Sequence, residues 1–117
     1  MRSMELLFSY GTLQKETVQR SLFGRVLSQT ADFLEGYKII RIEINDPEFL
    51  AKGENRFQNT LAPASNNKDK IKGTVLELTP EELDRADQYE PVGYTRKKVK
   101  LVSGRDAWIY MHKKNLS

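Results

Sequence analysis

The chain has 117 residues, of which 38% are hydrophobic and 30% are charged, a length and composition that suit one compact domain and exclude a wholly disordered protein. It has no cysteine and one histidine, which excludes disulfides, thiolate nucleophiles and metal sites built from thiolates or several histidines. The net charge of +3 would help to attract an anionic small molecule but is too small for a nucleic-acid-binding protein. We therefore expect a single domain, residues 1–117, with no metal and no cofactor.

No part of the sequence is typical of a membrane protein or of a secreted one. Its apolar runs are much shorter than the roughly 20 residues that cross a bilayer. The N-terminus lacks the basic and then apolar segments of a secretory signal. The sequence therefore predicts a cytoplasmic protein that does not contact a membrane.

The first predicted elements are a buried strand, a turn and a short helix. Residues 6–10 form an apolar and aromatic run that Gly11 ends. Between residues 14 and 23 the apolar side chains recur at helical spacing, and Gly24 suits a helix stop. This part of the chain predicts a strand, a glycine turn and an amphipathic helix.

The middle of the chain predicts strands and loops. Residues 31–44 are rich in aliphatic and aromatic residues with Gly36 among them, which indicates two strands or one sharply bent strand. Residues 46–48, Asp-Pro-Glu, can open a helical turn. Residues 52–70 mix glycine, asparagine, serine, lysine and proline, which predicts loops around one brief strand at residues 59–62.

A strand and a well-capped helix follow. Residues 71–78 alternate as a strand does. Residues 79–82 read Thr-Pro-Glu-Glu, in which the threonine can cap a helix, the proline suits its first position and the second glutamate completes a capping box. The helix should run to about Gln88, because a proline and a glycine soon afterwards prevent its continuation. Tyr89 and Glu90 therefore lie at the helix exit, where side chains can point into a cleft.

The last two strand-like runs, residues 94–102 and 106–113, are joined by Ser-Gly-Arg and predict a closing hairpin. In the second run Trp108 and Tyr110 alternate with two apolar residues, so one of these sets is expected to be core. The strands and helices do not alternate regularly, which disfavours a doubly wound sheet. The expected fold class is α+β: a mixed, partly closed β-barrel of six or seven strands with short flanking helices.

A four-residue turn follows the first predicted strand, Tyr10-Gly11-Thr12-Leu13. Glycine can adopt a backbone conformation closed to other residues, so that successive amide N–H groups converge on a carboxylate or carbonyl oxygen beside the Thr12 hydroxyl. The alternative is an ordinary glycine turn in which Tyr10 packs against the core. The segment from Phe8 to Leu13 resembles the opening of the γ-glutamylcyclotransferase-like family, in its avirulence-induced-gene-like group.

A second segment resembles the same family, residues 83–90 followed by Tyr94-Thr-Arg96. Members of the family have a helix that ends in a leucine-aspartate and then an acidic residue, followed by a tyrosine-x-arginine strand. On this chain the family's catalytic glutamate falls on Glu90. The two motifs stand in the family's order and, together, the resemblance covers most of the chain.

The resemblance implies a cofactor-independent enzyme that releases 5-oxoproline from a γ-glutamyl amine or amide. The glutamyl nitrogen closes on its own side-chain carbonyl, and Glu90 would take a proton from that nitrogen and return one to the departing amine. Aromatic and apolar neighbours would raise the pKa of Glu90 by desolvating its charged form. The turn from Tyr10 to Leu13 would bind the glutamyl group, with Tyr94 and Arg96 as further candidates for substrate binding.

Several alternatives stay open. Arg96 can pair with a carboxylate of the substrate or of the helix before it. Asp84 and Asp87 are expected to be exposed helix residues without a catalytic role. A small-molecule binding module without turnover is the alternative to an enzyme on the same fold. A nucleic-acid surface along residues 96–100 is disfavoured, because successive strand residues face opposite sides and divide the basic charges between two faces.

Overall fold

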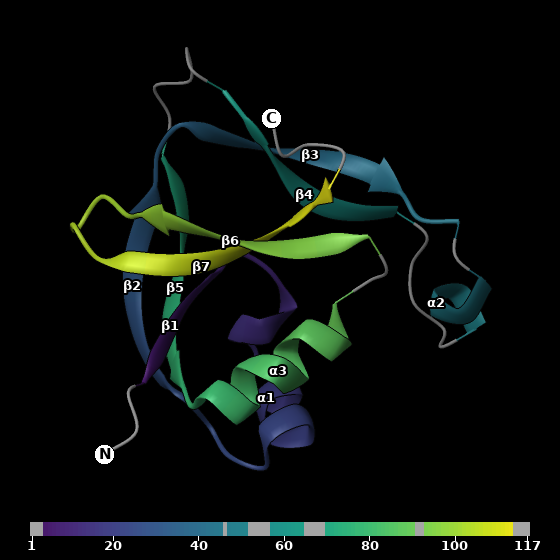
Figure 1. Ribbon diagram of the computed structural model, residues 1–117, viewed down its shortest axis with the longest axis horizontal. Helices are drawn as coiled ribbons and strands as arrows, with labels where there is room; N and C mark the ends of the chain where they lie inside the picture. The colour runs from purple at the N-terminus through teal and green to yellow at the C-terminus, as the bar shows by residue number, and fades with distance from the viewer. Residues whose placement is uncertain (1–3, 46, 52–56, 65–69, 91–92, 114–117) are drawn as a thin grey trace.

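The computed structural model describes residues 4–45, 47–51, 57–64, 70–90 and 93–113. In these residues the strands form a five-stranded sheet, in the order β2-β5-β1-β7-β6, and a two-stranded sheet of β3 and β4 (Figure 1). Neighbouring strands are antiparallel except β1 and β7, which are parallel. The elements are β1 (Glu5–Ser9), the 3-10 helix η1 (Thr12–Gln14), α1 (Glu16–Phe23), β2 (Ser28–Leu34), β3 (Tyr37–Glu43), α2 (Pro47–Ala51), β4 (Phe57–Pro63), β5 (Ile71–Leu78), α3 (Pro80–Tyr89), β6 (Tyr94–Lys100) and β7 (Asp106–His112).

The expected α+β fold with a partly closed barrel is confirmed. The five-stranded sheet curls until the turn after β6 reaches the opposite edge strand, β2, where the Val102 N–H donates to the Phe33 carbonyl (3.0 Å). The second sheet is connected to the first at β7, where the His112 N–H donates to the Thr60 hydroxyl of β4 (2.8 Å). These bonds join segments that the regular strand ladders leave apart.

The central strand β1 is buried on both faces. Leu7 and Phe8 have almost no exposed surface, and they point to opposite faces of the sheet because successive side chains of a strand alternate. Leu7 packs in a cluster that includes residues of α1 and α3, which lie together on one side of the sheet (Figure 1). Phe8 packs on the other face with residues of β2, β4, β5 and β7. This burial explains why β1 is a nearly continuous apolar run.

The first helix begins later than the sequence predicts. Residues 12–14 form η1, and α1 starts at Glu16 instead of residue 14. Its end is confirmed, because Gly24 adopts the left-handed conformation (φ 75°) and its N–H donates to the Arg20 carbonyl (3.0 Å). The two-strand alternative is also confirmed, since β2 and β3 are separate strands with Gly36 between them at φ 83°.

Mid-chain predictions are confirmed where the structure describes the residues. The expected helical turn is α2, and the strand predicted at residues 59–62 is the longer β4. The predicted opening residue of the helical turn, residue 46, lies outside the described residues. The predicted loops at residues 52–56 and 65–69 lie outside them as well.

Helix α3 has the predicted capping box. The Thr79 hydroxyl accepts from the Glu82 N–H (3.1 Å), and the Glu82 carboxylate accepts from the Thr79 N–H (2.9 Å). The helix ends at Tyr89, one residue beyond the predicted end, and Glu90 is its C-cap. The local sequence therefore determines where Glu90 leaves the helix.

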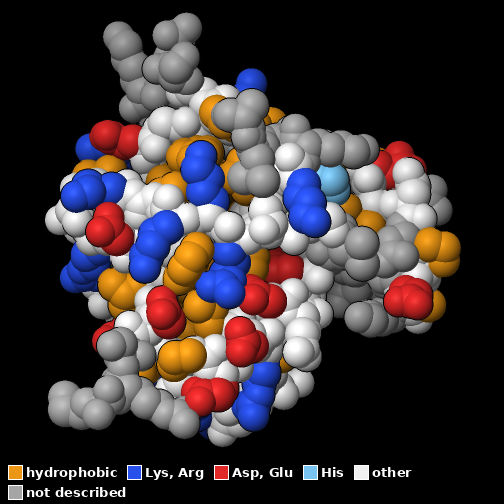
Figure 2. Space-filling view, viewed as in Figure 1, with side chains coloured by type: hydrophobic (Ala, Val, Ile, Leu, Met, Phe, Trp, Pro, Cys, Tyr) orange, Lys and Arg blue, Asp and Glu red, His pale blue; other side chains and the backbone are white. Residues whose placement is uncertain are grey.

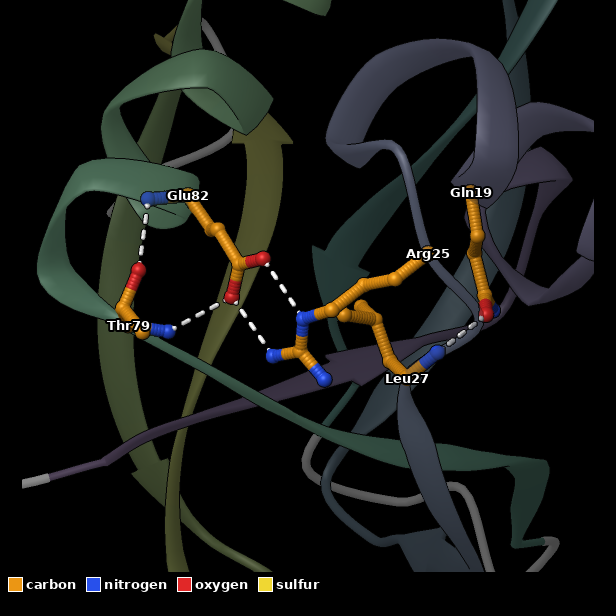
Figure 3. A network of polar contacts seen from close by, with 5 residues as sticks. All are labelled: Gln19, Arg25, Leu27, Thr79 and Glu82. Atoms are coloured by element: carbon orange, nitrogen blue, oxygen red, sulfur yellow. Dashed lines mark hydrogen bonds and ion pairs between the residues drawn. The ribbon is translucent and has the colours of Figure 1, made fainter.

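Glu82 also connects α3 to the segment that precedes β2. Arg25 donates to its carboxylate from Nε (2.8 Å) and from Nη2 (2.7 Å), as Figure 3 shows beside the cap. Hydrogen bonding to Arg25 is the largest cause that lowers the pKa of the Glu82 carboxyl group. The buried carboxylate therefore satisfies the helix start and joins two parts of the chain that are far apart in sequence.

We expect Glu82→Gln to lower the free energy of unfolding by about 1–2 kcal/mol, because the change weakens a helix cap and the charge-assisted pairing of a buried carboxylate with the partly exposed Arg25. Urea denaturation at pH 7 measures this loss, with Glu16→Gln, an exposed acid in the first turn of α1, as the control. The folded-state pKa of Glu82 is lowered, so the wild-type advantage is present above the unfolded-state pKa and is lost as the pH falls through the folded-state value. Equal losses in the two variants would contradict this role.

Strands β1 and β5 approach closely at Gly73. A Cβ atom at Gly73 would lie 2.5 Å from the Ser9 carbonyl oxygen and 2.5 Å from Phe8 Cζ. Because one of these atoms is backbone and the other belongs to a buried ring, we expect Gly73→Ala to lower the free energy of unfolding by about 2–3 kcal/mol. Thermal denaturation measures the loss, with Gly11→Ala as control, since a Cβ there meets nothing within 4 Å. A Gly73→Ala protein as stable as this control would show that the strands can separate without cost.

Candidate active site

A cavity of about 160 Å³ opens where β1 ends and the chain turns into η1. It lies between the glycine turn, which we define as Tyr10, Gly11, Thr12 and Leu13, and the exit of α3. Its lining residues are Leu7, Phe8, Ser9, Tyr10, Gly11, Thr12, Leu13, Gln58, Asn59, Glu90, Tyr94 and Tyr110. The structure thus brings the whole glycine turn, Glu90 and Tyr94 to one cavity, and leaves Arg96 out of its lining.

A buried glutamine holds the glycine turn in place. Gln19 of α1 donates from Nε2 to the Leu13 carbonyl (2.8 Å), and its Oε1 accepts from the Leu27 N–H (2.9 Å; Figure 3). Both ends of this amide are therefore used, inside a core from which water is excluded. The turn is also joined to the exit of α3, because the hydroxyls of Thr12 and Tyr89 share a hydrogen bond (3.0 Å).

The backbone of Gly11 differs from the predicted one. With φ −136° and ψ −144° it is not in the left-handed conformation that favours glycine, so that part of the prediction is wrong. A Cβ atom at this position would enter open space. The glycine therefore leaves room where the chain borders the cavity.

The amides of Thr12 and Leu13 lie at the start of η1. N–H groups at this position have no partner within the helix and can donate to a ligand.

Glu90 caps the C-terminal end of α3, with its N–H donating to the Ala86 carbonyl (3.2 Å). Burial raises the pKa of its carboxyl group to about 7, and the negative charge of Asp87 is the second cause. The C-terminal end of a helix carries a partial negative charge, which also disfavours a carboxylate. Near neutral pH the group therefore exists in both protonation states, as a group that accepts a proton and returns it must.

Three tyrosines share the cavity with Glu90. Burial is the largest cause that raises the pKa of each phenol, and the charge of Glu90 raises all three further; the pKa of Tyr94 rises to about 12. Tyr10 donates to the Tyr110 carbonyl (2.8 Å), and Tyr94 donates to the Asn59 carbonyl (2.9 Å). The phenols therefore stay neutral at physiological pH and fix the walls of the cavity.

Arg96 is paired with Asp87 of α3. Its Nε lies 2.7 Å from Oδ1, and its Nη2 donates to Oδ2 (3.0 Å). The guanidinium also lies over the Trp108 ring, 4.6 Å from the ring centroid. Of the two partners predicted for Arg96, the structure shows the helix carboxylate, and its position does not support the predicted contact with substrate.

The sequence gave no site role to several residues that line or support the cavity, among them Gln58, Asn59, Asp87 and Tyr110. Gln58 and Asn59 arrive through the second sheet, and no local motif distinguishes them. Asp87 is exposed as predicted, but it lies three residues before Glu90, a spacing that places both on one helix face and was the available signal. Tyr110 belongs to one of two alternating sets of strand residues, and the sequence did not decide which of the two sets is core.

The described residues provide no cluster of metal ligands and no membrane-spanning helix. No group of three histidine, aspartate or glutamate side chains in them is placed to hold a metal ion. Among the same residues, no helix combines the length and the apolar character needed to cross a membrane.

The sequence profile of the family described as gamma-glutamyl cyclotransferase, AIG2-like, matches residues 7–117. The chain belongs to this family. Two proteins of Arabidopsis thaliana with solution structures share the fold of this family member. At5g39720.1 has a TM-score of 0.76 and 22% identity over 97% of this chain and 72% of that one; At3g28950.1 has a TM-score of 0.74 and 17% identity over 100% of this chain and 67% of that one. The comparison with curated proteins gave no match.

Membership of the gamma-glutamyl cyclotransferase family confirms the resemblance seen in the two sequence motifs. The matched range contains both the glycine turn and Glu90, and the structural likeness extends over nearly all of the chain. The roles of the individual cavity residues stay predictions.

Proposed function

We propose that the chain is a γ-glutamylcyclotransferase that converts a γ-glutamyl amine or amide into 5-oxoproline and a free amine, with Glu90 as the general acid/base. The observation that carries this proposal is the position of Glu90, a carboxyl group of pKa about 7 in the same small cavity as the glycine turn. A general acid/base is most effective when its pKa lies near the operating pH. Glu90 meets this requirement without a metal or a cofactor.

The reaction is an exchange of one C–N bond for another. The α-nitrogen of the glutamyl group attacks the γ-carbonyl carbon, which forms the five-membered lactam, and the bond from that carbon to the leaving amine breaks. The α-nitrogen begins as an ammonium and loses two protons, while the leaving nitrogen gains two and departs as an ammonium. The Glu90 carboxylate can accept these protons one at a time and deliver them to the leaving nitrogen.

The glycine turn supplies the groups that would hold the substrate. The amides of Thr12 and Leu13 are donors at the start of η1, suited to a carboxylate or to the oxygen that becomes negative during attack. The cavity of about 160 Å³ is small. It is well below the roughly 300–1,000 Å³ of pockets for drug-sized ligands, so it suits an amino-acid-sized group held in a folded geometry that favours ring closure.

The test is release of 5-oxoproline from a panel of γ-glutamyl amino acids, γ-glutamyl amines and ε-(γ-glutamyl)lysine. We expect the wild type and Asp84→Asn to turn over the same substrates, because Asp84 is exposed on α3, and we expect Glu90→Gln to be severely impaired. Equal turnover by wild type and Glu90→Gln would remove Glu90 from the mechanism. Saturable binding of small carboxylates without release from any substrate would instead identify a non-catalytic binding module.

A further inference from the structure

Asp87 lies at the centre of a network that supports the cavity from outside. It accepts a hydrogen bond from the Tyr110 hydroxyl (2.5 Å) at Oδ1, and it pairs with Arg96 through both carboxylate oxygens. Tyr110 lines the cavity, whereas Asp87 and Arg96 do not. The carboxylate therefore contacts the wall of the cavity through Tyr110 and is held on its other side by a cation.

The network joins two elements of opposite charge. On the face shown in Figure 2, Asp and Glu side chains gather over α3, and Lys and Arg side chains lie along β6 above it. Asp87 and Arg96 connect these two groups, because one comes from the last turns of α3 and the other from the middle of β6. Arg96 is only partly exposed and is stacked on Trp108, so its position is fixed from two sides.

We propose that Asp87 is a positioning residue for the cavity: held by Arg96, it fixes the Tyr110 side chain in the cavity wall and keeps a negative charge one helical turn from Glu90. This role of Asp87 concerns the arrangement of the cavity, and only its expected effect on kcat/KM rests on the proposed function. Asp87 is itself outside the lining, so it acts through Tyr110 and Glu90 and not on the substrate.

The charges around Glu90 make this role measurable. Asp87 faces it from α3, the phenols of Tyr94 and Tyr110 from β6 and β7, and that of Tyr10 from the end of β1. The phenols are neutral near pH 7, so Asp87 is the anion that raises the pKa of Glu90, and Arg96 is the cation that neutralises Asp87. Removing the anion should lower the pKa of Glu90, whereas removing the cation should raise it.

The experiment follows the titration of the Glu90 carboxyl carbon by NMR in Asp87→Asn and Arg96→Met. We expect the midpoint to fall in Asp87→Asn, to rise in Arg96→Met, and to stay unchanged in Asp84→Asn, an exposed neutralisation on the same helix. Asp87→Glu, which restores the charge, should return the midpoint toward the wild-type value. Midpoints that do not move, or that move in the same direction in Asp87→Asn and Arg96→Met, would overturn the proposal.

Kinetic measurements on the same variants distinguish a failure of this inference from a failure of the proposed function. We expect kcat/KM of Asp87→Asn to fall about tenfold at pH 8, because Tyr110 loses its hydrogen-bond partner. The acidic limb of its pH profile should shift to lower pH, as the Glu90 titration midpoint does. Tyr110→Phe, which removes only the anchored hydroxyl, should reproduce the loss without moving the limb. If no variant or wild type releases 5-oxoproline, the proposed function fails and the NMR titration still decides the role of Asp87.

Discussion

Replacement of Glu90 by glutamine is expected to lower kcat for 5-oxoproline release by about 10²–10⁴-fold, the usual contribution of a general acid/base. The amide has nearly the same shape as the carboxyl group but neither accepts nor returns a proton, so substrate binding should change much less than kcat. In the wild type, kcat/KM should rise with pH through about 7, because the free enzyme must carry Glu90 as the carboxylate, which forms as the pH passes its raised pKa. Initial rates between pH 5 and pH 9 measure both expectations.

The same substitution is expected to stabilise the folded protein. The pKa of Glu90 rises from an ordinary 4.5 to about 7 on folding, so the folded state holds the proton more tightly than the unfolded state does. Stability is therefore lost as the pH rises from about 4.5 to 7, by up to about 3 kcal/mol. Glu90→Gln removes this cost, so it should be the more stable protein at pH 8, and the difference should vanish below about pH 4.5.

Urea denaturation of both proteins at pH 4 and pH 8 tests the gain, and Asp84→Asn is the matched control because it removes an exposed carboxylate from the same helix. A Glu90→Gln protein that is less stable than wild type at pH 8 would mean that the carboxylate is paired and not desolvated. A stable but inactive variant would exclude misfolding as the reason for lost turnover.

Replacement of Gln19 by methionine is expected to lower the free energy of unfolding by about 2–6 kcal/mol. Methionine has a similar length and fills the buried space, but it leaves the Leu13 carbonyl and the Leu27 N–H without a partner in the core. A buried polar group that loses its hydrogen bond costs about 1–3 kcal/mol, and two groups are affected. Urea denaturation with a fixed m-value measures the change.

Gln14→Met is the matched control for this experiment. Gln14 also uses both ends of its amide, donating to the Gly11 carbonyl (3.1 Å) and accepting from the Thr74 hydroxyl (2.8 Å). It is partly exposed, so water can replace its bonds and the loss should be at most about 1 kcal/mol. Similar losses in the two variants would show that water reaches Gln19 and that the glycine turn is not held by a dry contact.

The elements that the sequence predicts well are those with local chemical signals. The Thr-Pro-Glu-Glu run placed the start of α3 because a capping box satisfies its amides within four residues. The proline and the glycine that follow in the sequence placed Glu90 at the helix exit. Gly24 and Gly36 were informative because each occupies a positive-φ position. For Gly11 the sequence predicted the right place for a turn but the wrong backbone conformation. Its φ is negative, not positive.

The parts that sequence could not supply depend on contacts between distant segments. Gln58 and Asn59 enter the cavity only because the second sheet is joined to β7, and nothing in their neighbourhood encodes that junction. From the sequence, Arg96 could pair with a carboxylate of the substrate or of the helix before it. Its pairing with Asp87 is seen only once α3 is placed beside β6. Gln19 resembles any polar residue of an amphipathic helix until the fold buries it.

The central place of β1 determines when the cavity can form. Leu7 pairs with Leu76 on one side and with Trp108 on the other, so a strand synthesised early must wait for one synthesised late. Pairings so distant in sequence are slow to form. A nascent chain that ends just after α3 already contains the glycine turn and Glu90, yet it lacks Tyr94 and Tyr110. During synthesis on the ribosome, a ligand of the cavity should therefore have nothing to bind until the C-terminal hairpin emerges and docks.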